Sequence, residues 1–279
     1  MTGPLLEELK SARLQRRPCF LITLAATTGS VPRRAGAKMI VYPNGAASGT
    51  IGGGKFESLV LADALALPRH SPPLLKTYPL HEASPDSFGA VCGGEVTVLI
   101  EPQNPPPALT LVGAGHCSRA LAALATTCGW HVTVIDDRAE ELENFPADLA
   151  LHRPDAPAFI SGKSWQSDDA LVLISRNYQL DRDALAAALR RPGFGYLGMI
   201  GSQRKVRRVR DELLAEGFKP DDFSQLRAPL GLDLGADHPA EIAVSILAEI
   251  LTLFNRTSGA PLSLIQSPAP PPAPAPTPD

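Results

Sequence analysis

The stretch Leu109–Ala120, LTLVGAGHCSRA, decides the fold of the larger part of this chain. An apolar run leads into Gly113 and Gly115, and a helix-forming segment that begins at His116 follows. Gly113 permits a tight turn, and Gly115 lets a phosphate approach the backbone at the positive end of the helix. Asp136 follows after about twenty residues, the spacing of an acid that binds a ribose hydroxyl. The stretch therefore predicts a strand, a glycine turn and a helix that bind a nucleotide-like ligand.

One residue departs from the usual three-glycine pattern of such a nucleotide-binding turn. The third glycine of the usual pattern is replaced by Ser118, which is still small enough to pack a helix against a strand. The alternative interpretation is that Gly113 and Gly115 serve only the close packing of strand and helix.

The segments that follow alternate between short apolar runs and helical patterns. The predicted strands cover 108–112, 131–136, 170–175 and 194–200, and the predicted helices cover 116–127, 181–190 and 203–216. This rhythm is typical of a parallel sheet with helices on both faces. The predicted fold class is α/β, with a Rossmann-like doubly wound parallel sheet preceded by a smaller α+β N-terminal domain.

The last predicted helix, 239–255, is mostly apolar. Its polar residues form one narrow stripe, which consists of Glu241, Ser245, Glu249 and Thr252. A helix with so narrow a polar face is expected to pack between the sheet and another element, or at a subunit interface. A homodimer is the expected assembly.

The first hundred residues show a different pattern of short strands and turns. Predicted helices cover 5–14 and 55–67, and predicted strands cover 19–26, 38–42, 74–78 and 96–100. The predicted divisions are an N-terminal domain over 1–104, a proline linker over 105–107, the Rossmann-like domain over 108–258 and a disordered Pro/Ala tail over 259–279.

Composition excludes several classes of function. The chain has 279 residues with 26 Lys and Arg against 29 Asp and Glu, and this balance argues against binding nucleic acid through bulk positive charge. No apolar run is long enough for a membrane span, and the first residues carry no secretory pattern. The four cysteines form no C-x-x-C pair, which argues against a disulfide framework or a structural zinc site. A cytoplasmic protein with reduced thiols is expected.

The segment Gly49–Lys55, GTIGGGK, matches the first seven positions of a phosphate-binding P-loop. Phe56 then stands where Ser or Thr would hold magnesium, so an ATPase is not expected. Two interpretations remain. The segment is either a flexible turn, or a nest whose N–H groups at Gly52–Gly54 face an anionic ligand, with Glu57 at the start of the helix.

Cysteine positions suggest different environments. Cys92 is followed by Gly93 and Gly94, so a bulky ligand could approach its thiol, and a soft sulfur suits molybdenum, copper or persulfide chemistry. The alternative is that Cys92 is a buried packing residue. Cys117 starts a helix, where the helix end could depress its pKa. Cys19 and Cys128 lie in apolar segments and are predicted to be core residues.

The helix 203–216 carries five cations within seven residues. Such a run is typical of a solvated helix face. Ser202 is placed to cap this helix, however, and its first turn follows a parallel strand. Arg204 and Lys205 are therefore the alternative candidates for contact with a phosphate or an acidic partner.

Seven segments taken together and in order resemble the xanthine dehydrogenase accessory proteins, the XdhC/CoxI family. They are GSVPRRAGAKMIV, GTIGGGKFE, AVCGGEVTVLIEP, LVGAGHCSRALA, VTVIDDR, YLGMIGSQRK and GLDLGADHPAEIAVSILAEI. The resemblance runs from about Phe20 to Leu251. One segment departs from the family, because Ser175-Arg176-Asn177-Tyr178 stands where many relatives have a histidine-containing sequence. A histidine-dependent role for that loop is therefore not expected.

The resemblance implies a chaperone, not an enzyme. Such a protein binds molybdenum cofactor as cargo, protects it, supports its sulfuration and inserts it into the molybdenum subunit of xanthine dehydrogenase, with a cysteine desulfurase as sulfur donor. The cofactor-binding residues that it implies are Gly52, Gly53, Gly54, Glu57, Cys92, Gly93, Gly94, Gly113, Gly115, His116, Asp136, Arg138, Ser202, Arg204 and Lys205. Cys92 is the candidate metal contact, and the Rossmann loop could hold a nucleotide. The alternatives are an NAD(P)-dependent oxidoreductase, which the Rossmann loop alone suggests, and a scaffold without a ligand.

Overall fold

The computed structural model describes residues 3–68, 70–80, 94–147, 149–152, 155–191 and 193–263. The chain divides into two compact units, Met1–Pro106 and Pro107–Asp279. This division falls within 105–107, the segment where the sequence predicts a linker. Cys92, Gly93 and most of the predicted tail lie outside the described residues.

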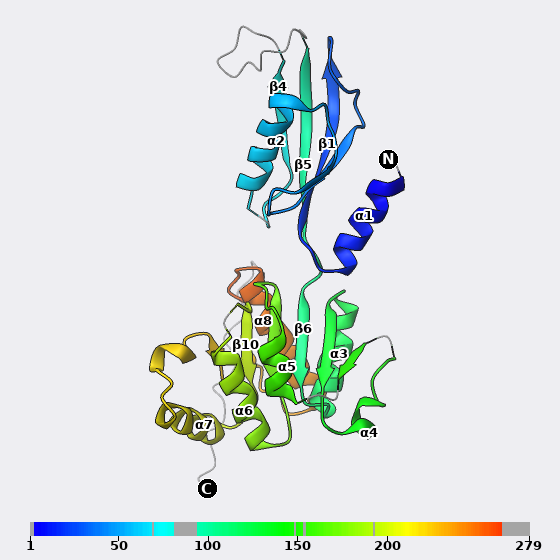
Figure 1. Cartoon of the computed structure of the whole chain (residues 1–279). Helices are drawn as coiled ribbons and strands as arrows, with labels where there is room; N and C mark the ends of the chain where they lie inside the picture. Colours follow the sequence, from blue (N-terminus) through cyan, green and yellow to red (C-terminus); the bar gives the residue numbers. More distant parts are fainter. Residues whose placement is uncertain are drawn as a thin grey trace. The chain divides into compact units, whose positions relative to one another are not determined.

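The first unit is an antiparallel sheet with two helices (Figure 1). In its described part the elements are α1 (Gly3–Leu14), β1 (Cys19–Thr28), β2 (Lys38–Val41), β3 (Ala47–Gly49), α2 (Gly54–Ala66), β4 (Leu74–Pro79) and β5 (Glu95–Gln103). The strand order is β3-β2-β1-β5-β4. The longest pairing joins β1 to β5, so these two strands form the centre of the sheet.

The two helices of the first unit cover opposite faces of this sheet. Successive side chains of β1 point to opposite faces, as in any strand. Ile22 packs in one cluster with Phe56 and Val60 of α2, and Cys19 packs in another with Leu5 of α1. Phe56, which replaces the Ser or Thr of a P-loop, is therefore a core residue, and burial of such a side chain stabilises the unit by about 1.5–3 kcal/mol.

The second unit is a parallel sheet with the order β11-β10-β9-β6-β7-β8. Its strands are β6 (Ala108–Val112), β7 (His131–Ile135), β8 (Ala150–His152), β9 (Asp169–Leu173), β10 (Tyr196–Met199) and β11 (Leu226–Arg227). Its helices are α3 (His116–Thr127), α4 (Ala139–Leu142), α5 (Ala156–Gly162), α6 (Tyr178–Leu189), α7 (Gln203–Ala215) and α8 (Pro239–Phe254), with a 3-10 turn η1 (Pro220–Phe223). The chain runs from β6 outward to β8 and then returns beside β6 as β9. The switch point of a doubly wound sheet therefore lies between β6 and β9.

Helices cover both faces of the second sheet, as the sequence predicts (Figure 1). Val172 of β9 packs in the cluster that contains α3 and α8, whereas its neighbours Leu171 and Leu173 pack in the cluster that contains α5, α6 and α7. Both faces of β9 are buried, which explains its continuous apolar sequence. The α/β fold class with a Rossmann-like sheet is confirmed.

The sequence patterns missed the third strand–helix pair of this sheet, β8 and α5. β8 has three half-buried residues at a sheet edge, which give no apolar run. α5 has seven residues, with a proline in its first turn and a glycine at its end. Elements this short carry too little periodicity to predict.

Two members of the polar stripe of α8, Ser245 and Glu249, face the protein. Glu249 Oε2 accepts hydrogen bonds from Tyr196 Oη at 2.6 Å and from the Gly231 N–H at 2.9 Å. Ser245, which is buried, donates to the Leu232 carbonyl at 2.5 Å. These bonds fix the loop that precedes α8, in agreement with the expected packing of this helix between the sheet and another element, whereas Glu241 at its start is exposed. Within the described ranges, no helix is long and apolar enough to cross a membrane.

Candidate functional site

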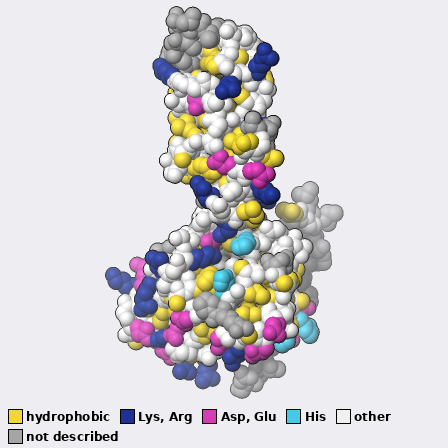
Figure 2. All heavy atoms as spheres, turned by 45° about the vertical axis from the view of Figure 1, so that its right-hand side comes forward, with side chains coloured by type: hydrophobic (Ala, Val, Ile, Leu, Met, Phe, Trp, Pro, Cys, Tyr) yellow, Lys and Arg dark blue, Asp and Glu magenta, His cyan; other side chains and the backbone are white. Residues whose placement is uncertain are grey.

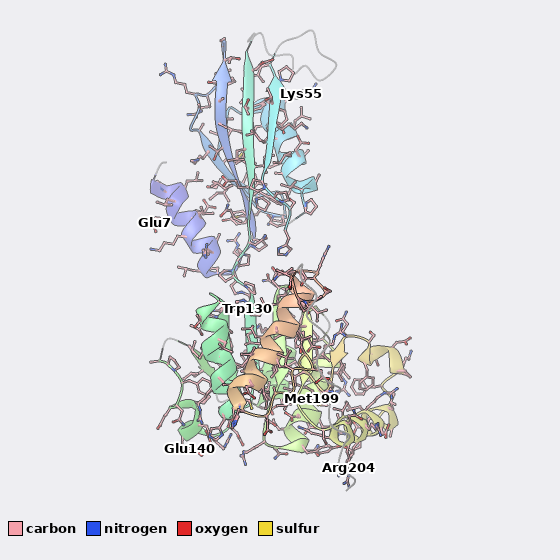
Figure 3. All side chains as sticks on the ribbon, turned by 180° about the vertical axis from the view of Figure 1, so that it is seen from behind. Glu7, Lys55, Trp130, Glu140, Met199 and Arg204 are labelled. Atoms are coloured by element: carbon pink, nitrogen blue, oxygen red, sulfur yellow. The ribbon has the colours of Figure 1, made fainter. Side chains whose placement is uncertain are left out.

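Three segments that are far apart in the sequence meet at the end of the first unit where β1 ends and β5 begins. A Cβ atom added to Gly52 would lie 3.2 Å from Pro32 Cβ, and one added to Gly94 would lie 2.7 Å from the Ser30 carbonyl oxygen. Lys55, in the first turn of α2, lies towards the same end (Figure 3). We name this group, residues 30–34, Gly52–Gly54 and Gly94, the N-terminal loop cluster.

The glycine loop of this cluster already surrounds an anion of the chain itself. Glu57 Oε2 accepts hydrogen bonds from Thr50 Oγ1 at 2.6 Å and from the N–H groups of Ile51 and Gly53, each at 3.0 Å. The Gly52 N–H donates to Thr50 Oγ1 at 3.2 Å. Within the predicted nest, the Gly53 N–H therefore points at Glu57, and the Gly52 N–H points at Thr50.

These bonds set the charge of Glu57. Its partial burial would raise the pKa of the carboxyl, but the hydrogen bonds from Thr50 and from the backbone N–H groups of Gly53, Ile51 and Gly52 outweigh burial and hold the pKa below its ordinary value. Glu57 is ionised at neutral pH. Its hydrogen-bond donors are all neutral groups, so the loop keeps a full negative charge.

The outer side of the cluster is open and cationic. Nothing lies within 4 Å of a Cβ atom added to Gly53 or Gly54, and α2 begins at Gly54. Arg33 and Arg34 are exposed on the neighbouring loop. On the face drawn in Figure 2, Lys and Arg side chains of the first unit gather at its two ends and are absent from its middle. Pro32, which directly precedes these arginines, borders Gly52, so the open start of α2 and the two exposed guanidinium groups belong to one loop cluster.

The cysteines of the described part do not form a reactive or metal-binding group. Burial raises the pKa of Cys117, against the expectation of a thiol activated by the helix end. Cys19 is buried as predicted, but Cys128 is exposed, because it caps α3 at the surface. In the described ranges, no three His, Cys, Asp or Glu side chains come together as a metal site. Cys92 lies outside these ranges.

The glycine turn after β6 lies at the switch point of the second sheet. Gly113 has φ of 114°, and a Cβ atom at this position would lie 2.6 Å from the Ile174 carbonyl oxygen and 2.7 Å from Ser175 Cα. Only glycine fits there, because the turn after β6 touches the turn after β9. Ser118 is fully buried, so it packs at the helix–strand contact as predicted.

Asp136, the candidate ribose ligand, is engaged within the protein. Its Oδ2 accepts the Ala114 N–H at 2.7 Å, and Arg138 binds both carboxylate oxygens at 2.9 Å. The Arg138 N–H also donates to Oδ1 at 3.0 Å. Burial would raise the pKa of Asp136, but the Arg138 guanidinium and the two backbone N–H groups hold it below its ordinary value. Both oxygens already have donors, so a ribose hydroxyl would have to displace Arg138.

The open part of this edge lies at the start of α3. Gly115, which precedes α3, has no atom within 4 Å of an added Cβ, and His116 is exposed. Arg176 from the turn after β9 approaches Asp137 from the turn after β7, with 3.7 Å between Nη2 and Oδ1. Because β6 lies between β9 and β7, this pair joins the turns on either side of the glycine turn. Both side chains are more than half exposed, so a ligand could separate them at low cost.

The candidates on α7 have different environments. Ser202 caps the helix, since its Oγ accepts the Lys205 N–H at 3.3 Å, as the sequence predicts. The Lys205 ammonium donates to the fully buried Asp181 and to the Ile200 carbonyl at 3.1 Å. Lys205 therefore ties α7 to α6, whereas Arg204 is exposed. Figure 3 shows Arg204 and Glu140 at one end of the second unit and Trp130 at the other.

Comparison with known proteins places these two units together in one family. Residues 109–250 match the model described as the XdhC Rossmann domain, and residues 12–79 match the model of the XdhC and CoxI family. The chain belongs to the XdhC and CoxI family. Both glycine loops, the Arg33–Arg34 pair and the Asp136–Arg138 pair lie within the matched residues of this XdhC-type protein.

Three curated proteins are similar to this XdhC-type chain. YqeB of Escherichia coli K12 is 34% identical over 255 residues, which cover 90% of this chain and 46% of YqeB. A protein of Bacillus subtilis, named as a probable subunit of xanthine dehydrogenase, is 32% identical over 163 residues, 58% of this chain and 47% of that protein. The chain thus spans about half the length of these two relatives. The molybdenum cofactor insertion chaperone PaoD of E. coli K12 is 25% identical over 276 residues, 87% of this chain and 85% of PaoD.

A solved structure also resembles the chain. It is described as a xanthine dehydrogenase from Bacillus halodurans, and it is 22% identical, with a TM-score of 0.48 over 92% of this chain and 98% of that one.

The structure adds three candidate site residues that the sequence patterns did not single out, namely Arg33, Arg34 and Arg176. The sequence contains two features that could have identified these residues. One is the adjacent pair of arginines between Pro32 and Gly36, and the other is the arginine that directly follows a central parallel strand. Neither signal is specific, because exposed arginines are common on protein surfaces. Their place beside the two glycine loops gives them their significance.

Proposed function

We propose that this chain is a molybdenum cofactor chaperone: it binds the cofactor as cargo, protects it, supports its sulfuration and inserts it into xanthine dehydrogenase. The proposal assigns it no turnover of its own. Its main support is the convergence of the Ser30–Arg34 segment, the Gly52–Gly54 loop and Gly94 at one end of the first unit. Similarity to PaoD, a named molybdenum cofactor insertion chaperone, agrees with this proposal.

The chemistry of the N-terminal loop cluster fits the phosphate end of such a cargo. Glu57 occupies N–H groups on the inner side of the loop, so the phosphate would bind on the outer side, at the start of α2 beside Gly54. Arg33 and Arg34 would supply charge-assisted hydrogen bonds there. The nearby Glu57 charge weakens the hold on an anion, which suits a carrier that must release its cargo.

Cys92 is proposed to orient or protect the metal end of the cargo. The proposal rests on the sequence Cys92-Gly93-Gly94, because adjacent glycines would let a bulky ligand approach the thiol and soft sulfur suits molybdenum. A cysteine desulfurase is the proposed sulfur donor, and the molybdenum subunit of xanthine dehydrogenase is the proposed recipient.

The second unit is proposed to bind a phosphate of the cofactor or of a nucleotide at Gly115 and His116, with Arg176 alongside. The open start of α3 supports this assignment. The alternative function, an NAD(P)-dependent oxidoreductase, is favoured by the strand order of the sheet alone. It is disfavoured by Asp136, whose two oxygens are taken by Ala114 and Arg138.

Anaerobic purification from cells that make the cofactor, followed by molybdenum and pterin analysis, tests this proposal. Molybdenum and pterin should co-purify in near-equal amounts with the wild-type chain. Replacement of Arg33 and Arg34 by Glu should lower both about tenfold, the loss of roughly 1.4 kcal/mol. Arg210→Glu, an exposed charge reversal in the second unit, is the matched control and should leave loading unchanged.

Two outcomes would redirect the assignment. Absence of molybdenum and pterin together with tight NAD(P) binding would favour the oxidoreductase. Normal loading and sulfuration by Cys92→Ala would remove Cys92 from the metal end. Light scattering on the same preparation tests the proposed homodimer, and a monomeric mass would exclude it.

A further inference from the structure

The first unit contains a pocket away from the N-terminal loop cluster. Its volume is about 230 Å³, and it lies between α1 and the paired ends of β1 and β5. Leu6, Leu9 and Cys19 contribute apolar surface to it. Burial raises the pKa of Cys19 to about 11, so this thiol is neutral and adds no charge.

The charged side chains that line this pocket are all positive. Lys10, Arg13 and Arg17 line it, and no carboxylate does. The Arg17 guanidinium stacks on the Tyr42 ring, 4.3 Å from the ring centre, and this contact holds Arg17 in place. Glu8 on α1 accepts a hydrogen bond from Tyr42 Oη at 3.0 Å. Among the described residues, no carboxylate forms an ion pair with any of the three cations.

The apolar surface continues beyond the pocket along α1. Leu6 is 49% exposed and Leu14 is 75% exposed, and Leu14 follows Lys10 by one helical turn. An apolar surface that polar residues surround marks a site of protein–protein interaction. The pocket is smaller than the usual site for a drug-sized ligand, and it is large enough for one bulky side chain. An apolar pocket within a polar rim is typical of the centre of a protein–protein interface.

We propose that this pocket docks an acidic segment of a partner protein, which inserts one bulky apolar side chain between Leu6 and Leu9 while its carboxylates pair with Lys10, Arg13 and Arg17. Charge complementarity selects an acidic segment, and the adjoining exposed leucines select a protein chain over a small anion. The inference stands apart from the cofactor proposal, because it concerns a different end of the first unit and does not require any cargo.

The test uses calorimetric titration of the full chain with three short capped peptides. In the first peptide one tryptophan is flanked on both sides by glutamates; in the second, alanine replaces tryptophan; in the third, glutamines replace the glutamates. The first should bind with a Kd well below about 1 mM, and the other two should bind at least tenfold more weakly, about 1.4 kcal/mol. Salt raised from about 0.05 M to about 0.5 M should weaken the first peptide.

Charge-reversal variants test whether the first peptide binds in this pocket. Arg13→Glu and Lys10→Glu should each weaken the first peptide about tenfold, and Arg210→Glu in the second unit should not. Equal binding of the three peptides, or no binding of any of them, would overturn the proposal. So would tighter binding of octanoate at the same residues, which would identify a site for small anionic amphiphiles. A dimer that Leu6→Arg converts to a monomer would instead assign the surface to a second copy of the chain.

Discussion

The two units each fold a glycine loop around a carboxylate of their own chain, but they balance its charge differently. In the first unit Glu57 comes from the helix that the loop itself starts, and its donors are a hydroxyl and backbone N–H groups. In the second unit Asp136 comes from the end of the neighbouring strand, and the Arg138 guanidinium grips both of its oxygens. A carboxylate close to its glycine loop in the sequence and a carboxylate far from its loop thus both accept hydrogen bonds from loop N–H groups.

The difference determines which charges remain beside each loop. Asp136 is buried and its charge is balanced by Arg138, which is 22% exposed, so this pair links β7 to the turn after β6. The Glu57 loop stays negatively charged and lies beside Arg33 and Arg34, which remain exposed. The first unit therefore carries, at one end, a carboxylate held by neutral donors and two exposed guanidinium groups.

The largest expected effect belongs to the contact between the turns after β6 and β9. Gly113→Ala should destabilise the second unit by about 3–4 kcal/mol, because the new methyl group meets the Ile174 carbonyl at a backbone angle that only glycine adopts freely. Urea denaturation followed by tryptophan fluorescence measures this unit alone, since both tryptophans, Trp130 and Trp165, lie in it.

Gly115→Ala is the matched control for that change. Its added methyl group meets nothing within 4 Å, and its φ is −75°, so the stability should change by no more than about 0.5 kcal/mol. Equal loss in both variants would contradict the assignment of the tight contact to Gly113.

Asp136→Asn should cost the second unit about 2 kcal/mol. The substitution leaves Arg138 partly buried without its charged partner and weakens the bond from the Ala114 N–H. The same fluorescence-detected denaturation applies. The control, Asp137→Asn, removes an acid that is 70% exposed and should change the free energy of unfolding by less than about 0.5 kcal/mol. An equal loss of stability in Asp137→Asn and Asp136→Asn would show that any negative charge in this turn stabilises the unit, and that the bond to Arg138 has no special role.

Glu57→Gln should cost the first unit about 1 kcal/mol, because a neutral amide oxygen accepts the loop N–H groups more weakly than a carboxylate. Amide hydrogen exchange in β1 measures this unit, which contains no tryptophan. Glu7→Gln on α1 is the control, since Glu7 is exposed, and it should leave exchange unchanged. Faster exchange in both variants to the same extent would refute a special role for Glu57.

The same residue predicts a pH dependence of the first unit. The folded pKa of Glu57 lies below its ordinary value of 4.5, so the folded state binds fewer protons than the unfolded chain in this range. The stabilisation is fully present above about pH 4.5 and is lost as pH falls through the folded pKa. Hydrogen exchange in the wild type should therefore accelerate below about pH 4.5 more than in Glu57→Gln, after correction for intrinsic rates; parallel profiles would contradict this linkage.

The smallest stability effect is expected for the double replacement of Arg33 and Arg34 by Glu. Both side chains are exposed, so hydrogen exchange in β1 should indicate a change of less than about 0.5 kcal/mol, while cofactor loading falls. A large loss of stability would mean that these arginines hold the loop together. The proposed difference between the two glycine loops would then fail.

The sequence by itself determined the elements with strong periodicity. The glycine turn in Leu109–Ala120, the buried strands of the second sheet and the long helices α3, α7 and α8 follow from local patterns, because 3.6-residue and continuous apolar repeats record which faces are buried. The Ser202 cap and the exclusion of a P-loop by Phe56 are equally local, since each depends on one side chain at one position.

Only the tertiary structure decided what the glycine loops face. Sequence patterns cannot show that Asp136 reaches Ala114, or that the stripe of α8 binds the Gly231 loop, because these partners are brought together by strand order and helix packing. The same holds for Arg33 and Arg34, whose loop is brought towards Gly52 by the pairing of β2 with β1 and β3. Local sequence specifies the backbone shape of each loop, and long-range packing selects the charged groups that fill or surround it.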